Sequence, residues 1–93
     1  PSISGKTAVV VGLGDLGEAA ARAAKKIGLK VIGVRRSAQK NRHADRVVTY
    51  RQLDKVLPQA DFVVLAVPLT AETRGLLNAA RMDLLKPSAG VIN

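Results

Sequence analysis

Three glycines in the segment Gly12–Gly17 have the spacing of a turn that binds phosphate groups. The G-x-G-x-x-G pattern follows the apolar, β-branched run Thr7–Val11 and precedes an Ala-rich segment with helical spacing, which is the context that gives it meaning. Gly12 would permit a tight bend, Gly14 would let the backbone approach a pyrophosphate, and Gly17 would let the helix pack against the strand. The free N–H groups at the helix start would bind the phosphate oxygens. The alternative is a glycine turn that serves packing alone.

A second group with binding chemistry, Arg35-Arg36-Ser37, follows the next apolar run about twenty residues past the glycine turn. A fold that binds NAD places Asp or Glu there to accept hydrogen bonds from the adenosine ribose. Two guanidinium groups and a hydroxyl would instead bind a 2′-phosphate through charge-assisted hydrogen bonds. The residues therefore favour NADP(H) over NAD(H). The alternative is a solvated basic loop, because the basic run continues to Arg46.

Two titratable side chains near these groups are expected to have no chemical role. Asp15 stands in the first turn of the expected helix, where the helix dipole favours an acid, and we expect it to point to solvent. His43 is expected to be an exposed loop residue, because no second histidine or suitably placed acid accompanies it.

Charge and composition narrow the class of ligand. The chain has 93 residues and a net charge of +8, and residues 1–46 carry ten basic against three acidic side chains. Such a surface predicts an anionic partner. Tyr50 and Phe62 are the only aromatic residues, which argues against nucleic acid and for a compact phosphate ligand. The chain has no cysteine, one histidine and no apolar run of membrane-spanning length, so we expect no metal site, no membrane partner and a cytoplasmic location.

These groups require elements that position them. Apolar runs alternate with helical segments, which predicts an α/β fold with a doubly wound parallel five-stranded sheet. The expected strands are Thr7–Val11, Val31–Val34, Val47–Tyr50, Asp61–Val67 and Gly90–Asn93. The expected helices are Asp15–Ile27, Arg51–Leu57 closed by Pro58, one near Glu72 capped by Thr70, and one from Asn78 through Leu85. In the first helix one apolar face is expected, formed by Leu16, Ala19, Ala20, Ala23, Ala24 and Ile27.

The chain resembles the nucleotide-binding domain of the D-2-hydroxyacid dehydrogenases from about Gly5 to Asn93. Three segments carry the resemblance: SGKTAVVVGLGDLGEAAARAAKKIGLKVIGVRRS, DFVVLAVPLTAETRGLLN and MDLLKPSAGVIN. The second and third are more specific than the glycine turn. The Arg-Arg-Ser group is similar to that of NADPH-preferring glyoxylate/hydroxypyruvate reductases in this family.

The resemblance implies roles for individual residues. Gly14, Asp15, Leu16 and Gly17 would line the pyrophosphate, largely through backbone groups, and Arg35, Arg36 and Ser37 would hold the 2′-phosphate. Pro68 would lie beside the adenosine half of the cofactor, and Thr73 near the phosphates. Without the resemblance, Pro68 reads as a strand terminator and Thr73 as a hydroxyl in the first turn of a helix.

The resemblance also implies that residues 1–93 form a partial NAD(P)-binding Rossmann domain, with the strand order 3-2-1-4-5 and without the catalytic Arg, Glu and His of the family. We therefore expect an NADP(H)-binding fragment with no catalytic residue and no turnover of its own. The alternative is an engineered or excised structural fragment that folds but binds no ligand. It could form a homodimer through the exposed edge strand Gly90–Asn93, because an unpaired apolar edge invites pairing with another copy.

Overall fold

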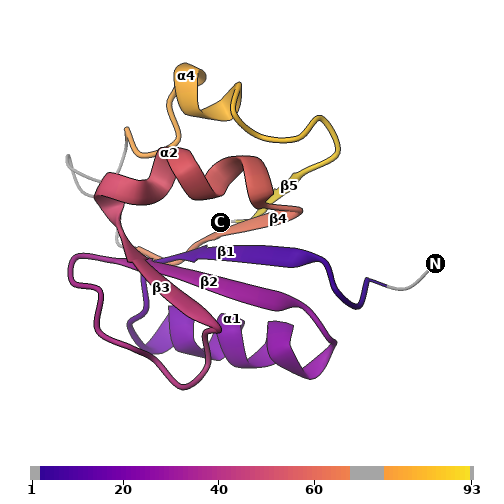
Figure 1. Ribbon diagram of the computed structural model, residues 1–93, viewed down its shortest axis with the longest axis vertical. Helices are drawn as coiled ribbons and strands as arrows, with labels where there is room; N and C mark the ends of the chain where they lie inside the picture. The colour runs from indigo at the N-terminus through magenta and orange to yellow at the C-terminus, as the bar shows by residue number, and fades with distance from the viewer. Residues whose placement is uncertain (1–2, 68–74, 93) are drawn as a thin grey trace.

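A computed structural model describes residues 3–67 and 75–92 of the chain. These residues form a five-stranded parallel sheet in the order β3-β2-β1-β4-β5 (Figure 1). The strands are β1 Thr7–Val11, β2 Lys30–Arg35, β3 Arg46–Thr49, β4 Phe62–Leu65 and β5 Gly90–Ile92. The expected fold class and strand order are confirmed. β1 has the expected bounds, and the ends of the other strands differ from expectation by two residues at most.

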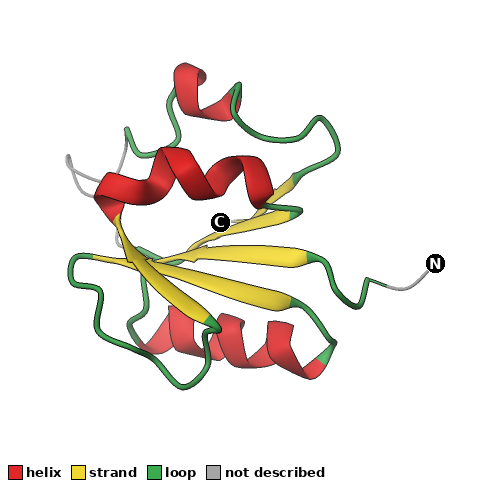
Figure 2. Cartoon of the chain, in the orientation of Figure 1, coloured by secondary structure: helices red, strands yellow, loops and turns green. Residues whose placement is uncertain are grey.

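Helices cover both faces of the sheet (Figure 2). Helix α1, Asp15–Lys26, lies on one face. The opposite face carries the 3-10 helix η1 Tyr50–Gln52, α2 Leu53–Val56, the 3-10 helix η2 Leu57–Gln59, and α4 Ala79–Met82. Successive residues of a strand point to opposite faces of the sheet. In β1, Ala8 and Val10 therefore pack in the core between the sheet and α1, and Val9 and Val11 pack in the core between the sheet and α2. Because helices cover both faces of the sheet, both sets of strand side chains are buried. This explains why the strands are continuous apolar runs with no alternation of apolar and polar residues.

The buried face of α1 differs from the expected one. Gly17, Ala21 and Ala24 are buried, whereas Leu16 and Ile27 are 70% and 55% exposed. The small side chains face the sheet because they let the helix axis approach it closely. The helix also ends at Lys26, one residue earlier than expected, and Ile27 is its C-cap.

The segment after β3 also differs from expectation. A 3-10 turn begins at Tyr50, which was expected to end the strand, and Pro58 lies inside η2 instead of closing a helix. Pro58 is tolerated there because the first turn of a helix does not need its N–H. Asn78 caps α4 as expected, with its side chain accepting from the Arg81 N–H at 3.0 Å.

The helix expected near Glu72, with its cap Thr70, falls outside the described residues. The expected continuation of α4 to Leu85 is wrong, since i→i+3 turns follow Met82. Among the described residues, no helix is long and apolar enough to cross a bilayer.

Candidate dinucleotide-binding site

Gly12 and Gly17 are both required by the packing of the turn between β1 and α1. Gly12 has a φ of +96°, and a Cβ there would lie 2.6 Å from Val67 Cγ1 and 2.7 Å from the Ala66 carbonyl oxygen. A Cβ on Gly17 would run into the Gly12 carbonyl oxygen. The tight bend and the close approach of α1 thus both depend on the absence of a side chain.

Gly14 is different, because no other part of the chain described by the structure lies within 4 Å of a Cβ built there. It is the N-cap residue of α1, and no side chain caps the helix. The first N–H groups of an α-helix have no partner within the helix. In α1 the first intrahelical bond comes from the Glu18 N–H, so those of Asp15, Leu16 and Gly17 precede the helical ladder. Asp15 and Leu16 are exposed at this end, as expected for Asp15. A backbone cradle of this kind fits an anion such as a pyrophosphate.

The arginine group adjoins the glycine turn through the register of the sheet. The Gly12 N–H donates to the Val34 carbonyl at 2.8 Å, so the next residue, Arg35, lies beside the turn at the carboxyl edge of the sheet. Arg35 is half-buried at the end of β2, and Arg36 and Ser37 follow as exposed residues of a bend.

The other side of the glycine turn is formed by the residues after β4. The Ala66 N–H donates to the Val11 carbonyl at 2.8 Å, which places this segment against the end of β1. The turn therefore lies where β1 has β2 on one side and β4 on the other, at the point where the strand order reverses. In open α/β sheets, ligands bind at this point. Pro68 and Thr73 lie outside the described residues.

The ten residues between β2 and β3, 36–45, pack back onto α1. The Asn41 side-chain N–H donates to Glu18 Oε1 at 3.0 Å. The Asp45 carboxylate accepts from Lys25 Nζ at 2.7 Å and from the Val31 N–H at 2.7 Å. The Lys25 hydrogen bond, followed by that of Val31, lowers the pKa of Asp45 below its ordinary value. The basic loop is thus attached to α1 near both ends of the helix.

His43 is not the fully exposed residue that we expected. It is half-buried and, with Asp15, Glu18 and Arg22, lines a recess of about 140 Å³ beside α1. The loop brings it there because Asn41 Oδ1 accepts from the His43 N–H at 2.9 Å and closes a tight polar turn. Sequence reasoning did not single out Glu18, Asn41 or Asp45, although Asn41 two residues before His43 is the local signal of such a turn.

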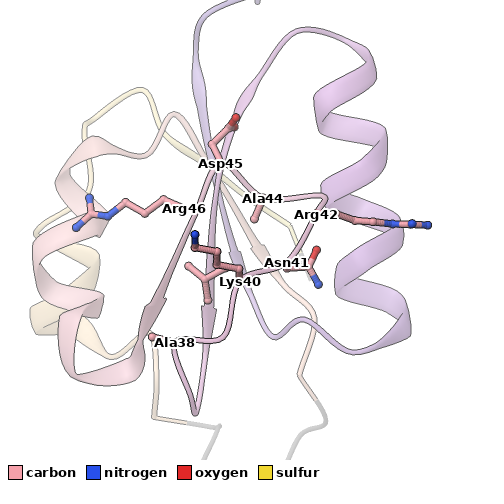
Figure 3. Close-up of a pocket in the computed structure, with 8 residues that line it drawn as sticks. Ala38, Lys40, Asn41, Arg42, Ala44, Asp45 and Arg46 are labelled. Carbon is pink, nitrogen blue, oxygen red and sulfur yellow. The ribbon is translucent and has the colours of Figure 1, made fainter.

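A larger open hollow, of about 640 Å³, lies between this loop and the start of β3. Its basic side chains are Lys40, Arg42 and Arg46. Figure 3 shows Arg42 and Arg46 extending in opposite directions from the loop, so their charges do not converge on one point. The hollow therefore lacks the focused geometry of an anion site. Over the described ranges, no three His, Cys, Asp or Glu side chains gather as metal ligands would.

Comparison with known proteins agrees with this geometry. The family model of the NAD-binding domain of D-isomer specific 2-hydroxyacid dehydrogenases matches residues 1–93. The chain therefore belongs to this family and is an NAD-binding domain of its type.

Relatives of known sequence in this family include glyoxylate reductases. Those of Pyrococcus furiosus and Thermococcus kodakarensis are 40% identical over 89 residues and 38% identical over 91 residues. The matches cover 96% and 98% of this chain but 26% and 27% of the relatives, so the chain spans about a quarter of their length.

Solved structures show the same similarity. The NADPH-dependent glyoxylate/hydroxypyruvate reductase of Sinorhizobium meliloti, in complex with NADP and sulfate, has a TM-score of 0.82 at 37% identity, covering 92% of this chain and 27% of that one. A D-isomer specific 2-hydroxyacid dehydrogenase family protein of Aeromonas salmonicida has a TM-score of 0.89 at 36% identity, covering 98% of this chain and 29% of that one.

Proposed function

We propose that this chain binds NADP(H) in preference to NAD(H) at the carboxyl edge of its sheet, and that it binds without turnover on its own. The protein to which such a domain belongs would transfer hydride from NADPH to a 2-oxo acid such as glyoxylate or hydroxypyruvate. Residues 1–93 would be its partial Rossmann domain, with a cytoplasmic location and no catalytic residue. The Sinorhizobium meliloti reductase, whose complex contains NADP, supports the cofactor assignment by similarity.

The observation that carries the proposal is the hydrogen bond from the Gly12 N–H to the Val34 carbonyl. It joins the glycine turn to the end of β2, so an uncapped helix start and an arginine pair lie on one edge of the sheet. In NADP the pyrophosphate and the 2′-phosphate are both attached to the ribose of the adenosine moiety, and these two features would bind one each.

The roles of the chain's own residues follow from this arrangement. Backbone N–H groups of Asp15, Leu16 and Gly17 would donate to the pyrophosphate, with Gly14 leaving room for it. Arg35, Arg36 and Ser37 would hold the 2′-phosphate, where guanidinium groups give bidentate hydrogen bonds. Pro68 and Thr73 would contact the adenosine half and the phosphates, as the family resemblance implies. The bound dinucleotide would supply the hydride.

Calorimetric titration with NADPH and NADH tests the proposal. We expect tighter binding of NADPH, and loss of that preference in the double variant Arg35→Ala/Arg36→Ala. The matched control is Lys26→Ala/Lys30→Ala. It removes two exposed positive charges at the end of α1 and the start of β2, away from the carboxyl ends of the strands, and should keep the preference. Equal affinity for both cofactors in the unmodified chain would contradict the specificity, and no heat with either from a folded sample would contradict binding.

A second candidate, from a different class, is a chain that folds and self-associates without binding a ligand. It is favoured by β5, which lies at the end of the described sheet with Val91 and Ile92 39% and 52% exposed. Pairing between two copies through Gly90–Asn93 would cover this edge. Sedimentation velocity over a wide concentration range should then show a dimer. Monomer at every concentration would exclude this candidate.

A further inference from the structure

The connection between β2 and β3 is unusual for parallel strands, because residues 36–45 contain no helix. Such crossovers usually contain one, which packs on the sheet and fixes the connection in place. This loop begins with Arg36 and Ser37, so its position decides where their side chains can act. That position must come from contacts with neighbouring elements.

Asn41 provides such a contact to α1 and also closes a turn within the loop. Its Oδ1 accepts from the His43 N–H at 2.9 Å, and its carbonyl oxygen accepts from the Ala44 N–H at 3.1 Å. Its Nδ2 donates to Glu18 Oε1 at 3.0 Å. Figure 3 shows the Asn41 amide on the side of the loop that faces α1. The turn and its attachment to α1 therefore share one side chain.

Glu18 is hydrogen-bonded both to the loop, through Asn41, and to the glycine turn, through Gly14. Its backbone N–H donates to the Gly14 carbonyl at 2.8 Å and closes the first turn of α1. Its carboxylate holds Asn41 from the same position. One residue thus links the backbone cradle at Gly14 to the loop that follows Arg35.

We propose that Glu18 is a positioning residue for cofactor selectivity. By holding Asn41, it fixes the loop that begins with Arg36 and Ser37, so that their side chains are held where they can meet a phosphomonoester on the ribose of a bound dinucleotide. This inference rests on the proposed function, which it extends to residues that touch neither phosphate.

Electrostatics alone predicts the opposite effect of Glu18. A carboxylate in the first turn of α1 repels phosphates, so its removal should strengthen the binding of anions, and most of all the binding of the more highly charged NADPH. A positioning role predicts that its removal weakens NADPH selectively. The direction of the change in the NADPH/NADH affinity ratio therefore separates the two roles.

The experiment compares Glu18→Ala, Glu18→Gln and Asn41→Ala by calorimetric titration with both cofactors. Glu18→Ala should lower the affinity ratio by about threefold to tenfold, the typical effect of one lost hydrogen bond. Glu18→Gln removes the charge but keeps an acceptor for Asn41, so its ratio should stay at the original value or rise. Asn41→Ala should reproduce the loss, and the double variant with Glu18→Ala should lose no more than either single variant.

A ratio that is unchanged or raised in Glu18→Ala would overturn the proposal. Amide hydrogen exchange without cofactor gives a second, independent reading, because the His43 and Ala44 amides report the Asn41 turn. Glu18→Ala should speed their exchange and Glu18→Gln should not, and equal exchange in both would also overturn the proposal. If the unmodified chain shows no preference for NADPH, the proposed specificity fails, while hydrogen exchange still decides whether Glu18 fixes the loop.

Discussion

The side chain of Leu13, in the glycine turn, packs directly over Gly33 in β2. A Cβ on Gly33 would lie 2.5 Å from Leu13 Cδ1 and 3.1 Å from Leu13 Cγ. Leu13 is 6% exposed and belongs to the core between the sheet and α1. The glycine inside the strand V-I-G-V is thus required by the turn, since glycine in a strand often marks a close approach.

Gly33→Ala should therefore destabilise the protein by forcing Leu13 out of its place, at a cost of about 1 kcal/mol because the atoms in the way end a flexible side chain. In a Leu13→Ala background the same change should cost nothing. Urea unfolding of the four proteins measures this coupling. Gly75→Ala is the control, since a Cβ there meets none of the described residues within 4 Å. Equal costs of Gly33→Ala in both backgrounds would contradict the packing argument.

The glycines of the turn should separate folding from binding. Gly17→Ala should cost at least about 3 kcal/mol, because the new methyl group meets the Gly12 backbone. Gly14→Ala should change stability by less than about 1 kcal/mol, as a loss at the N-cap is offset by a stiffer unfolded chain. We expect Gly14→Ala nevertheless to weaken cofactor binding. Chemical denaturation and calorimetric titration of each variant check both statements, and unaltered affinity in Gly14→Ala would contradict the position proposed for the pyrophosphate.

Asp61 should make stability depend on pH in the acid range. Its carboxylate accepts from the Thr7 N–H at 2.9 Å and from Lys86 Nζ at 3.0 Å. These bonds, with the charges of Lys86 and Lys6, lower its pKa in the folded state below the ordinary 3.8. A lowered folded-state pKa means that the stabilisation is present above the unfolded-state pKa and is lost as pH falls through the folded-state value.

Asp61→Asn should therefore be less stable than the unmodified chain at about pH 7, and the difference should shrink below about pH 4. Asparagine can still accept from Thr7, so the difference reports the carboxylate charge. Urea unfolding at several pH values measures it. A difference that stays constant down to the lowest pH would show that the charge has no part in it.

The two partners of the Lys25–Asp45 pair should differ in their contribution to stability. Lys25→Ala should cost less than about 1 kcal/mol, because the ion pair is largely exposed. Asp45→Ala should cost about 1–3 kcal/mol, because it also leaves the partly buried Val31 N–H without its acceptor. Thermal or urea unfolding compares the variants, and equal losses would show that the bond to Val31 contributes little.

Local pattern was enough to predict a doubly wound parallel sheet, and the family resemblance supplied its strand order. β-Branched runs such as Thr7–Val11 mark buried strands, and right-handed crossovers leave few topologies for them. The buried face of α1 was not predicted correctly. Alanines lie on two sides of this helix, so the spacing of apolar residues favours neither side as the buried face. What decides between them is the contact of Gly17 with the Gly12 backbone, which is a tertiary effect.

The site divides in the same way. Short-range spacing predicted that the glycines follow the first strand and that Arg35 lies at the end of the second, and the structure confirms these places. Their role in cofactor binding stays a prediction. The bonds that hold the basic loop join Glu18 to Asn41 and Lys25 to Asp45, 23 and 20 residues apart. No local pattern reports pairs at that distance, and only the folded structure shows them.

The helix-free connection between β2 and β3 has a consequence for how ligand preference can change over evolution. Residues 36–43 carry little of the apolar core, which the strands, α1 and α2 supply. Under the proposed function, substitutions in this segment would therefore be screened mainly for what they do to binding and hardly for what they do to folding. The sequence of such a segment could change, or be redesigned as a unit, and alter ligand preference without a change in the sheet.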